Sequence, residues 1–209
     1  MLDDNINNFP AYAARFDGAD VPVGSIVRWR FEAAEITDTD GHACVHTDAC
    51  DDLAALAAAL GAMDELRLRL IEGQAVGDVR LLLTRAEEIG FIGAIGACKA
   101  GTIPRGARVL ALENSRAFDD APIGGGPIVR VGDRISVFTP QVTADVARIA
   151  EAIGGPALPK ASEKHDAAKA WRWQRKLMAG GACEASVCCA SGLAAACVCL
   201  PLGSYHCMA

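Results

Sequence analysis

The stretch Val79-Arg-Leu-Leu-Leu-Thr84 runs directly into Arg85-Ala-Glu-Glu88, and this junction decides the fold. A short, continuous apolar run is typical of a strand that is buried on both faces, as strands of parallel sheets are. Two adjacent carboxylates follow the run almost at once. The stretch therefore predicts a buried strand whose carboxyl end leads to Glu87 and Glu88.

The flanking sequence alternates between helix and strand patterns. Apolar residues from Leu53 to Leu70 recur at intervals of three and four, as in an amphipathic helix, and two aspartates precede them in position to cap it. Further strands are expected at 107–112, 128–131, 171–178 and 193–200, and further helices at 89–99, 143–153 and 182–190. This order indicates an α/β fold, a three-layer α/β/α sandwich with a mostly parallel central sheet.

The composition excludes several classes of protein. Apolar residues make up 52% of the 209-residue chain, but its longest apolar stretch falls well short of the roughly 20 residues of a membrane-spanning helix. The net charge is -6 and the basic residues are dispersed, which argues against a nucleic-acid partner. Met1 to Asn8 has none of the features of a signal peptide, so we expect a cytoplasmic protein.

The nine cysteines could suggest a disulfide framework, but their number is odd and no C-x-x-C motif occurs. We expect reduced, mostly buried thiols; disulfides or a thiolate metal site are the alternatives.

Acidic residues and one histidine occur at the expected ends of successive elements. They are Asp51 and Asp52 before a helix, Glu87 and Glu88 after a strand, Glu113 at the end of the next strand, and His206 after the last. Taken singly, these residues could be a helix cap, a solvated turn and a terminal histidine. Taken together, they match the needs of a dinuclear hydrolytic site, in which a carboxylate bridges two cations and another accepts a proton from water.

Four motifs in this order resemble the co-catalytic zinc aminopeptidases and related metallopeptidases, which include tetrahedral, glutamyl and leucyl aminopeptidases. The motifs are Ala49-Cys-Asp-Asp-Leu53, Leu82-Leu-Thr-Arg-Ala-Glu-Glu-Ile-Gly-Phe-Ile-Gly-Ala94, Leu110-Ala-Leu-Glu113 and Leu202-Gly-Ser-Tyr-His206. The resemblance implies a zinc-peptidase catalytic domain at 41–209. It also implies that residues 1–40, which contain a turn and a short strand pattern from Val21, are the remnant of a β-rich lid or dimerisation domain.

The resemblance further implies a role for each acidic residue. Asp51 would bridge two divalent metal ions, and Glu87 would be the general base. Glu88 and His206 would complete one metal site, while Glu113, where the family often has aspartate, would bind the other metal. Zinc is the expected metal, with cobalt or manganese as alternatives.

One expected ligand of this family is absent from the sequence. The family has an upstream His-x-Asp motif, separated from the bridging aspartate by the inserted domain, and the chain resembles a fragment that starts after it. His46-Thr-Asp48 has the right form but lies only five residues before Asp51, so we expect His46 to be a surface or outer-shell residue. His42 and His165 are also expected on the surface.

The expected function is hydrolysis of N-terminal peptide bonds by a metal-activated water, with a peptide as substrate and a homo-oligomer as the assembly. Two alternatives stay open. One is a truncated homologue that keeps the fold without catalysis. The other is a related carboxypeptidase, deacylase or amidohydrolase with the same metal chemistry.

Overall fold

The structure is a computed structural model that describes residues 20–22, 24–25, 33–39, 42–157 and 171–205. Contacts divide the chain into two compact units, residues 1–31 and 32–209. The second unit contains nearly all of the described residues and is the subject below. The turn and strand predicted from Val21 fall mostly outside the described residues, so the assignment of residues 1–40 to a remnant domain stays a prediction.

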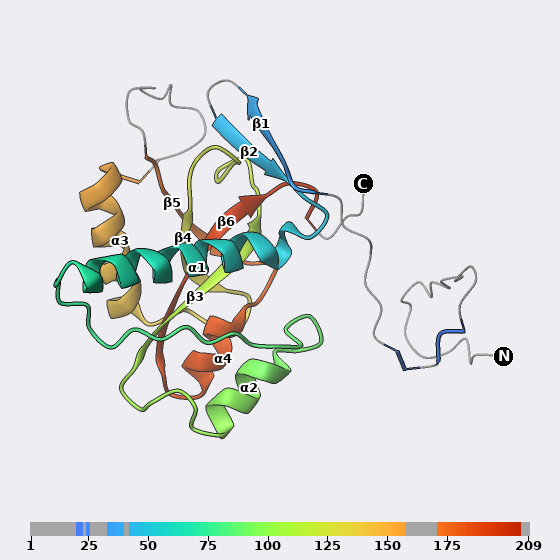
Figure 1. Ribbon diagram of the computed structural model, residues 1–209, viewed down its shortest axis with the longest axis vertical. Coiled ribbons are helices and arrows are strands. Elements are labelled where there is room, and N and C mark those ends of the chain that lie inside the picture. The colour runs from blue at the N-terminus through green and yellow to red at the C-terminus, as the bar shows by residue number, and fades with distance from the viewer. Residues whose placement is uncertain (1–19, 23, 26–32, 40–41, 158–170, 206–209) are drawn as a thin grey trace. The chain divides into compact units, whose positions relative to one another are not determined.

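The central sheet of the second unit is mixed, with the strand order β3-β6-β4-β5 (Figure 1). Its strands are β3 (Arg108–Arg116), β4 (Ile128–Asp133), β5 (Gln174–Met178) and β6 (Ala194–Leu202). The β3/β6 and β4/β5 pairs are parallel, and β4 runs antiparallel to β6. Two of the three pairings are therefore parallel, which agrees with the predicted α/β sheet.

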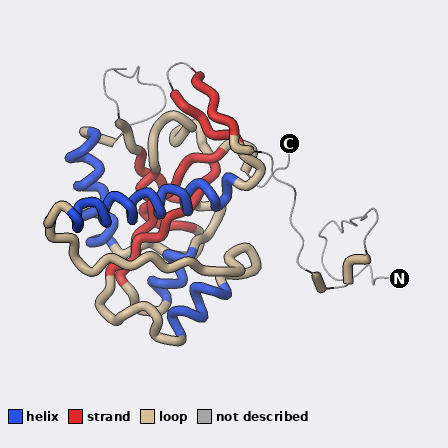
Figure 2. Tube along the Cα trace, viewed as in Figure 1, coloured by secondary structure: helices blue, strands red, loops and turns tan. Residues whose placement is uncertain are grey.

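Helices cover both faces of this sheet (Figures 1 and 2). They are α1 (Cys50–Ile71), α2 (Ile92–Lys99), α3 (Pro140–Gly154) and α4 (Glu184–Ala190). The α1 helix packs on β3 and β6, α3 packs on β6 and β4, and α4 packs on β6, β3 and α2. The predicted three-layer architecture is thus confirmed.

Alternate residues of β6 separate the two faces of the core. Cys197 packs with Phe138 and with Cys183 and Cys188 of the α4 region. The next residue, Val198, packs on the opposite side with α3 and Trp173. Small side chains such as alanine and cysteine let helices approach the sheet closely, so the cysteines act as core residues. All cysteines among the described residues are free thiols, as expected.

The predicted strand at Val79–Thr84 is wrong. This segment is irregular (tan in Figure 2) and its side chains are not buried: Leu82 is 45% exposed and Leu83 is 60% exposed. An apolar run shows which residues prefer burial, but a strand also needs a hydrogen-bonded neighbour. No strand among the described residues pairs with this segment.

Most other elements form where the sequence predicts them, with shifted ends. The helix expected at 89–99 begins only at Ile92, because Gly90 and Phe91 have positive φ values of 104° and 59°. The strand expected to end near Glu113 continues to Arg116, so Glu113 lies inside β3. The sequence did not predict the antiparallel hairpin of β1 (Glu35–Thr39) and β2 (His42–His46).

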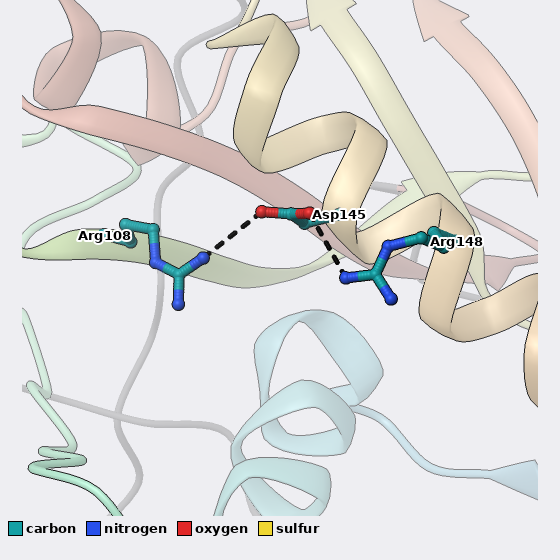
Figure 3. Close-up of polar contacts among 3 residues, drawn as sticks. All are labelled: Arg108, Asp145 and Arg148. Atoms are coloured by element: carbon teal, nitrogen blue, oxygen red, sulfur yellow. Dashed lines mark hydrogen bonds and ion pairs between the residues drawn. The ribbon is translucent and has the colours of Figure 1, made fainter.

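An exposed ion-pair cluster joins the start of β3 to α3 (Figure 3). Asp145 accepts hydrogen bonds from Arg108 at 3.2 Å and from Arg148 at 3.3 Å. Such solvent-exposed pairs contribute little to stability.

The helices among the described residues are all too short or too polar to cross a membrane.

We predict that Phe138→Ala destabilises the chain strongly. Phe138 is fully buried in the cluster around Cys183 and Cys197, so its removal leaves a cavity that costs about 3–5 kcal/mol. The neighbouring Val137 is 74% exposed, and Val137→Ala should change the free energy of unfolding by only about 0.5 kcal/mol. Urea denaturation followed by fluorescence measures both; equal effects would contradict this core assignment.

Candidate metal centre

Three carboxylates from two elements meet at the carboxyl-terminal half of β3. Asp51 and Asp52 lie at the entrance of α1, and Glu113 lies within β3. One ligand oxygen from each lies within 4.8 Å of those of the other two. This is the arrangement of a site that could hold a divalent cation, for which carboxylate oxygens are suitable ligands.

The entrance of α1 is irregular, and this irregularity places both aspartates. Asp51 (φ -90°, ψ 106°) and Asp52 (φ -117°, ψ 24°) have non-helical backbone conformations, and the helix has no side-chain cap hydrogen bond. The N-cap position is occupied by Ala49, which has no capping side chain, so a cap by the aspartates stays a prediction. Their carboxylates belong to the cluster with Glu113.

Asn114 fixes this entrance to the sheet. Its side chain is buried and donates hydrogen bonds from Nδ2 to Asp52 Oδ1 at 2.9 Å and to the Cys50 carbonyl at 2.7 Å. Two adjacent residues of β3 thus meet the entrance of α1, Glu113 as a member of the cluster and Asn114 as its anchor.

Crowding raises the pKa values of two carboxyl groups. Desolvation, followed by the charges of Asp51, Glu87, Glu184 and Glu88, raises the pKa of Asp52 to about 7. Burial is the main cause that raises the pKa of Glu113 to about 10, and Glu87 and Asp52 add to it. These interactions place the predicted Glu87 and Glu88 within electrostatic reach of the cluster.

Glu87 and Glu88 lie on a tightly folded turn before α2. Ala86 and Phe91, which flank them, both have φ values of 59°, in the left-handed region that non-glycine residues rarely adopt. The turn is closed by backbone hydrogen bonds from Phe91 to Glu87 at 2.9 Å and from Gly93 to Arg85 at 2.9 Å. Strained backbone of this kind is common at functional sites.

Thr84 ties the start of the turn to α4. Its Oγ1 donates a 2.6 Å hydrogen bond to Oε1 of Glu184.

The last described residue, Tyr205, lies close to the same cluster. Burial, followed by the charge of Asp51, raises the pKa of Tyr205 to about 12, and Glu113 and Glu88 contribute in the same direction. Tyr205 immediately precedes the predicted ligand His206, which lies outside the described residues. The end of β6 therefore leads toward the carboxylates. The assignment of His206 as a metal ligand stays a prediction.

The structure thus brings together Asp51 and Glu113, with Glu87 and Glu88 nearby, and adds Asp52 and Asn114. The sequence shows Asp52 beside Asp51 but suggests a helix cap, and nothing in it distinguishes Asn114. His46 lies in the β1/β2 hairpin, where its Nε2 is 2.8 Å from Thr37 Oγ1, and it belongs to no metal-type cluster of the described residues. His165 and the side chain of His42 are outside the described residues.

The donor set fits a divalent cation. Burial, followed by the charges of neighbouring carboxylates, raises the pKa of Asp52 and of Glu113, so both groups favour the protonated form in the absence of a cation. A cation would replace the protons and remove the repulsion.

The PhTET1-12s dodecamer structure has a similar fold. The chain matches the PhTET1-12s dodecamer structure with a TM-score of 0.55 and 20% sequence identity, over 83% of this chain and 46% of that chain. A TET aminopeptidase structure from the marine sediment archaeon Thaumarchaeota archaeon SCGC AB-539-E09 matches with a TM-score of 0.43 and 20% identity, over 56% of this chain and 30% of that one. The chain therefore spans about half the length of the PhTET1-12s chain. A search of curated proteins gives no match.

The fold and the cluster define an α/β protein with a carboxylate site suited to a divalent cation. The family model for M42 glutamyl aminopeptidase matches residues 16–209. The chain belongs to this M42 family.

We predict that the metal-free chain loses stability as the pH rises. The folded-state pKa of Asp52 (about 7) and that of Glu113 (about 10) exceed their ordinary values of 3.8 and 4.5, so the folded chain holds protons that the unfolded chain releases. The free energy of unfolding, measured in EDTA, should therefore fall as the pH rises from 5 to 8. This range begins above the ordinary pKa values of both groups and passes through the raised pKa of Asp52.

Asp52→Asn should make this decline shallower, whereas Asp64→Asn, on the exposed surface of α1, should leave it unchanged. Urea denaturation at several pH values measures the slope. A wild-type chain that is more stable at pH 8 than at pH 5 would contradict the assignment.

Proposed function

We propose that this chain contributes the metal-binding and catalytic residues of an aminopeptidase that hydrolyses N-terminal peptide bonds. The observation that carries the proposal is the convergence of Asp51, Asp52 and Glu113, with Glu87 and Glu88 within electrostatic reach, in a chain of the M42 family. We also infer a homo-oligomer in the cytoplasm. The dodecameric assembly of PhTET1-12s supports the oligomer by analogy only.

The ligands would divide between two cations. Asp51 would bridge them, Glu88 and His206 would hold one, and Glu113 would hold the other. Asp52 belongs to the same carboxylate cluster, and its side chain accepts a hydrogen bond from Asn114. It is therefore suited to orient the cluster or to supply a further oxygen ligand. The raised pKa of Asp52, about 7, implies that cation binding at neutral pH displaces a proton from this group.

Glu87 would act as the general base. It lies beside the cluster on the strained turn and adds to the raised pKa of both Asp52 and Glu113. When bound, divalent ions would lower the pKa of a water molecule and polarise the substrate carbonyl. Glu87 would accept the proton of the attacking water and pass it to the leaving amine. The adjacent Glu88 would keep to the binding role, because consecutive side chains diverge.

A second candidate is a homologue that binds metal without catalysis. It is favoured by the donor set, since the described cluster consists of carboxylates alone. Zinc peptidase sites usually include histidine, whereas sites made only of oxygen suit magnesium, calcium or manganese. A carboxypeptidase, deacylase or amidohydrolase remains a third candidate. A panel of substrates with free and blocked amino termini separates it from an aminopeptidase.

We predict opposite effects for the two adjacent glutamates. Glu87→Gln should reduce hydrolysis by about 10²–10⁴-fold while leaving the bound metal nearly unchanged. Glu88→Gln should lower the metal content, because a carboxamide is a weaker ligand than a carboxylate. Metal analysis and an aminopeptidase assay test both variants, with Glu151→Gln on the exposed side of α3 as the matched control. Equal metal loss in both variants would show that the roles are misassigned.

We also predict unequal affinities for two zinc ions. Asp51, Glu88 and His206 give one ion three protein ligands, the usual minimum, whereas Asp51 and Glu113 alone give the other ion two. Isothermal titration of the metal-free 209-residue chain should therefore show one strong site and one weak site, and the chain should hydrolyse aminoacyl substrates very slowly. Two tight sites with rapid turnover would show that Asp52, His46 or a partner chain completes the second site.

A further inference from the structure

Two thiols from different helices meet where α2 and α4 pack on each other (Figure 1). Cys98 lies near the end of α2, and Cys188 lies within α4. Both belong to the cluster around Phe138, Cys188 as a buried member and Cys98 as a residue packed against it. The two side chains are joined by a hydrogen bond. Two thiols that are far apart in the sequence are therefore in direct contact.

The two thiols differ in their access to solvent. Cys98 is only partly buried, whereas Cys188 is 4% exposed. The rate at which a thiol is oxidised depends on its exposure and on its thiolate fraction. A dissolved oxidant therefore meets Cys98 first and finds Cys188 directly behind it. An accessible thiol beside a second, resolving thiol is the arrangement found in redox-sensing cysteines.

The other thiol contacts of this core lack an accessible member. Cys197 forms side-chain hydrogen bonds with Cys183 and with Cys199, and each of the three is 1% exposed or less. An oxidant reaches such thiols only when the core opens locally. Among the described residues, the contact of Cys98 with Cys188 is thus the one suited to react while the fold stays closed.

We propose that Cys98 and Cys188 form a reversible disulfide between α2 and α4 when the chain meets hydrogen peroxide. The Cys98 thiolate attacks one peroxide oxygen, the O–O bond breaks, and Cys98 becomes a sulfenic acid as hydroxide leaves. The Cys188 thiolate then attacks the sulfenic sulfur, an S–S bond forms, and the S–O bond breaks with loss of a second hydroxide. The two protons given up by the thiols convert both hydroxides to water. Two thiols and one peroxide thus yield one disulfide and two water molecules.

The first step makes the second one easier. Burial is the main cause that raises the pKa of Cys188 to about 12, followed by the charge of Cys98 and the hydrogen bond between the two side chains. A sulfenic acid at Cys98 is neutral, so the contribution of that charge disappears once the first step is complete. Cys188 then forms its thiolate more readily than it does beside a Cys98 thiolate.

The bond would join the two helices that flank the turn with Glu87 and Glu88. The α2 helix begins shortly after this turn, and α4 begins at Glu184, which accepts the hydrogen bond from Thr84 before the turn. Both ends of the turn therefore lead to α2 and α4. In the reduced chain α2 rests on α4 by packing, and the disulfide would add a covalent link to it.

The test is peroxide oxidation of the reduced, full 209-residue chain in EDTA. Free thiols are then blocked with iodoacetamide, and the linked peptides are identified by mass spectrometry without reduction. A parallel sample contains dimedone, which traps sulfenic acids. The variants are Cys98→Ser and Cys188→Ala, with Cys44→Ser as the matched control because Cys44 is also a partly buried thiol.

We expect the wild-type chain to form a Cys98–Cys188 link within one chain, which dithiothreitol reverses. Cys188→Ala should accumulate at least about tenfold more dimedone adduct at Cys98 than the wild type, because the resolving thiol is missing. Cys98→Ser should leave Cys188 as a free thiol, and Cys44→Ser should behave as the wild type. Because Cys98 is only partly buried, Cys98→Ser gives a decisive result even if Cys188→Ala does not fold.

Three results would overturn the proposal. The first is that Cys98 and Cys188 stay unlinked while the chain is oxidised elsewhere or not at all. The second is that a link between Cys183 and Cys197 forms faster than the proposed one. The third is that Cys98 links to a second chain, which non-reducing electrophoresis detects as a dimer.

Discussion

The burial and close approach of several carboxylates is the constraint on which the candidate site depends. Asp51, Asp52 and Glu113 place oxygens within 4.8 Å of one another, and Glu87, Glu88 and Glu184 add charge nearby. Such a group cannot be fully ionised at low cost without a cation, and at neutral pH protons partly take that role. The remainder of the site holds these side chains together against their repulsion.

Asn114 and Arg130 supply much of that restraint from inside the fold. The Arg130 side chain is 1% exposed on β4, and its Nη2 donates a 2.8 Å hydrogen bond to the Asn114 carbonyl. Asn114 in turn donates to Asp52, so one chain of hydrogen bonds runs from β4 through β3 to α1. The buried positive charge also lowers the pKa of Glu113, against the larger effect of burial. The buried Arg130 guanidinium thus offsets part of the repulsion among the carboxylates.

The sequence predicts the parts of this arrangement that depend on local patterns. The spacing of leucines gives α1, and the order of strands and helices gives the three layers, because both reflect burial along one element. Asp51 and Glu113 are predictable because acidic residues recur near the ends of the expected elements and lie in motifs that resemble the zinc aminopeptidases. The role of Asn114 is not predictable, since it depends on a contact across 62 residues of sequence. Val79–Thr84 misleads because an apolar run indicates burial, whereas a strand also needs a hydrogen-bonded partner, and no strand of the described residues pairs with this segment.

The same segment leads into the candidate site. Residues 79–83 make no backbone hydrogen bond to another described residue, and the chain then passes through Thr84, whose hydroxyl donates a hydrogen bond to Glu184, to the turn with Glu87 and Glu88. The position of the proposed base is therefore restrained on its α2 side by the backbone bonds of the turn, and on its other side by the side-chain hydrogen bond of Thr84. General-base catalysis depends on hydrogen-bond distances, which an unpaired segment holds less tightly than a strand does. The conformation of residues 79–83 therefore bears directly on the positions of Glu87 and Glu88.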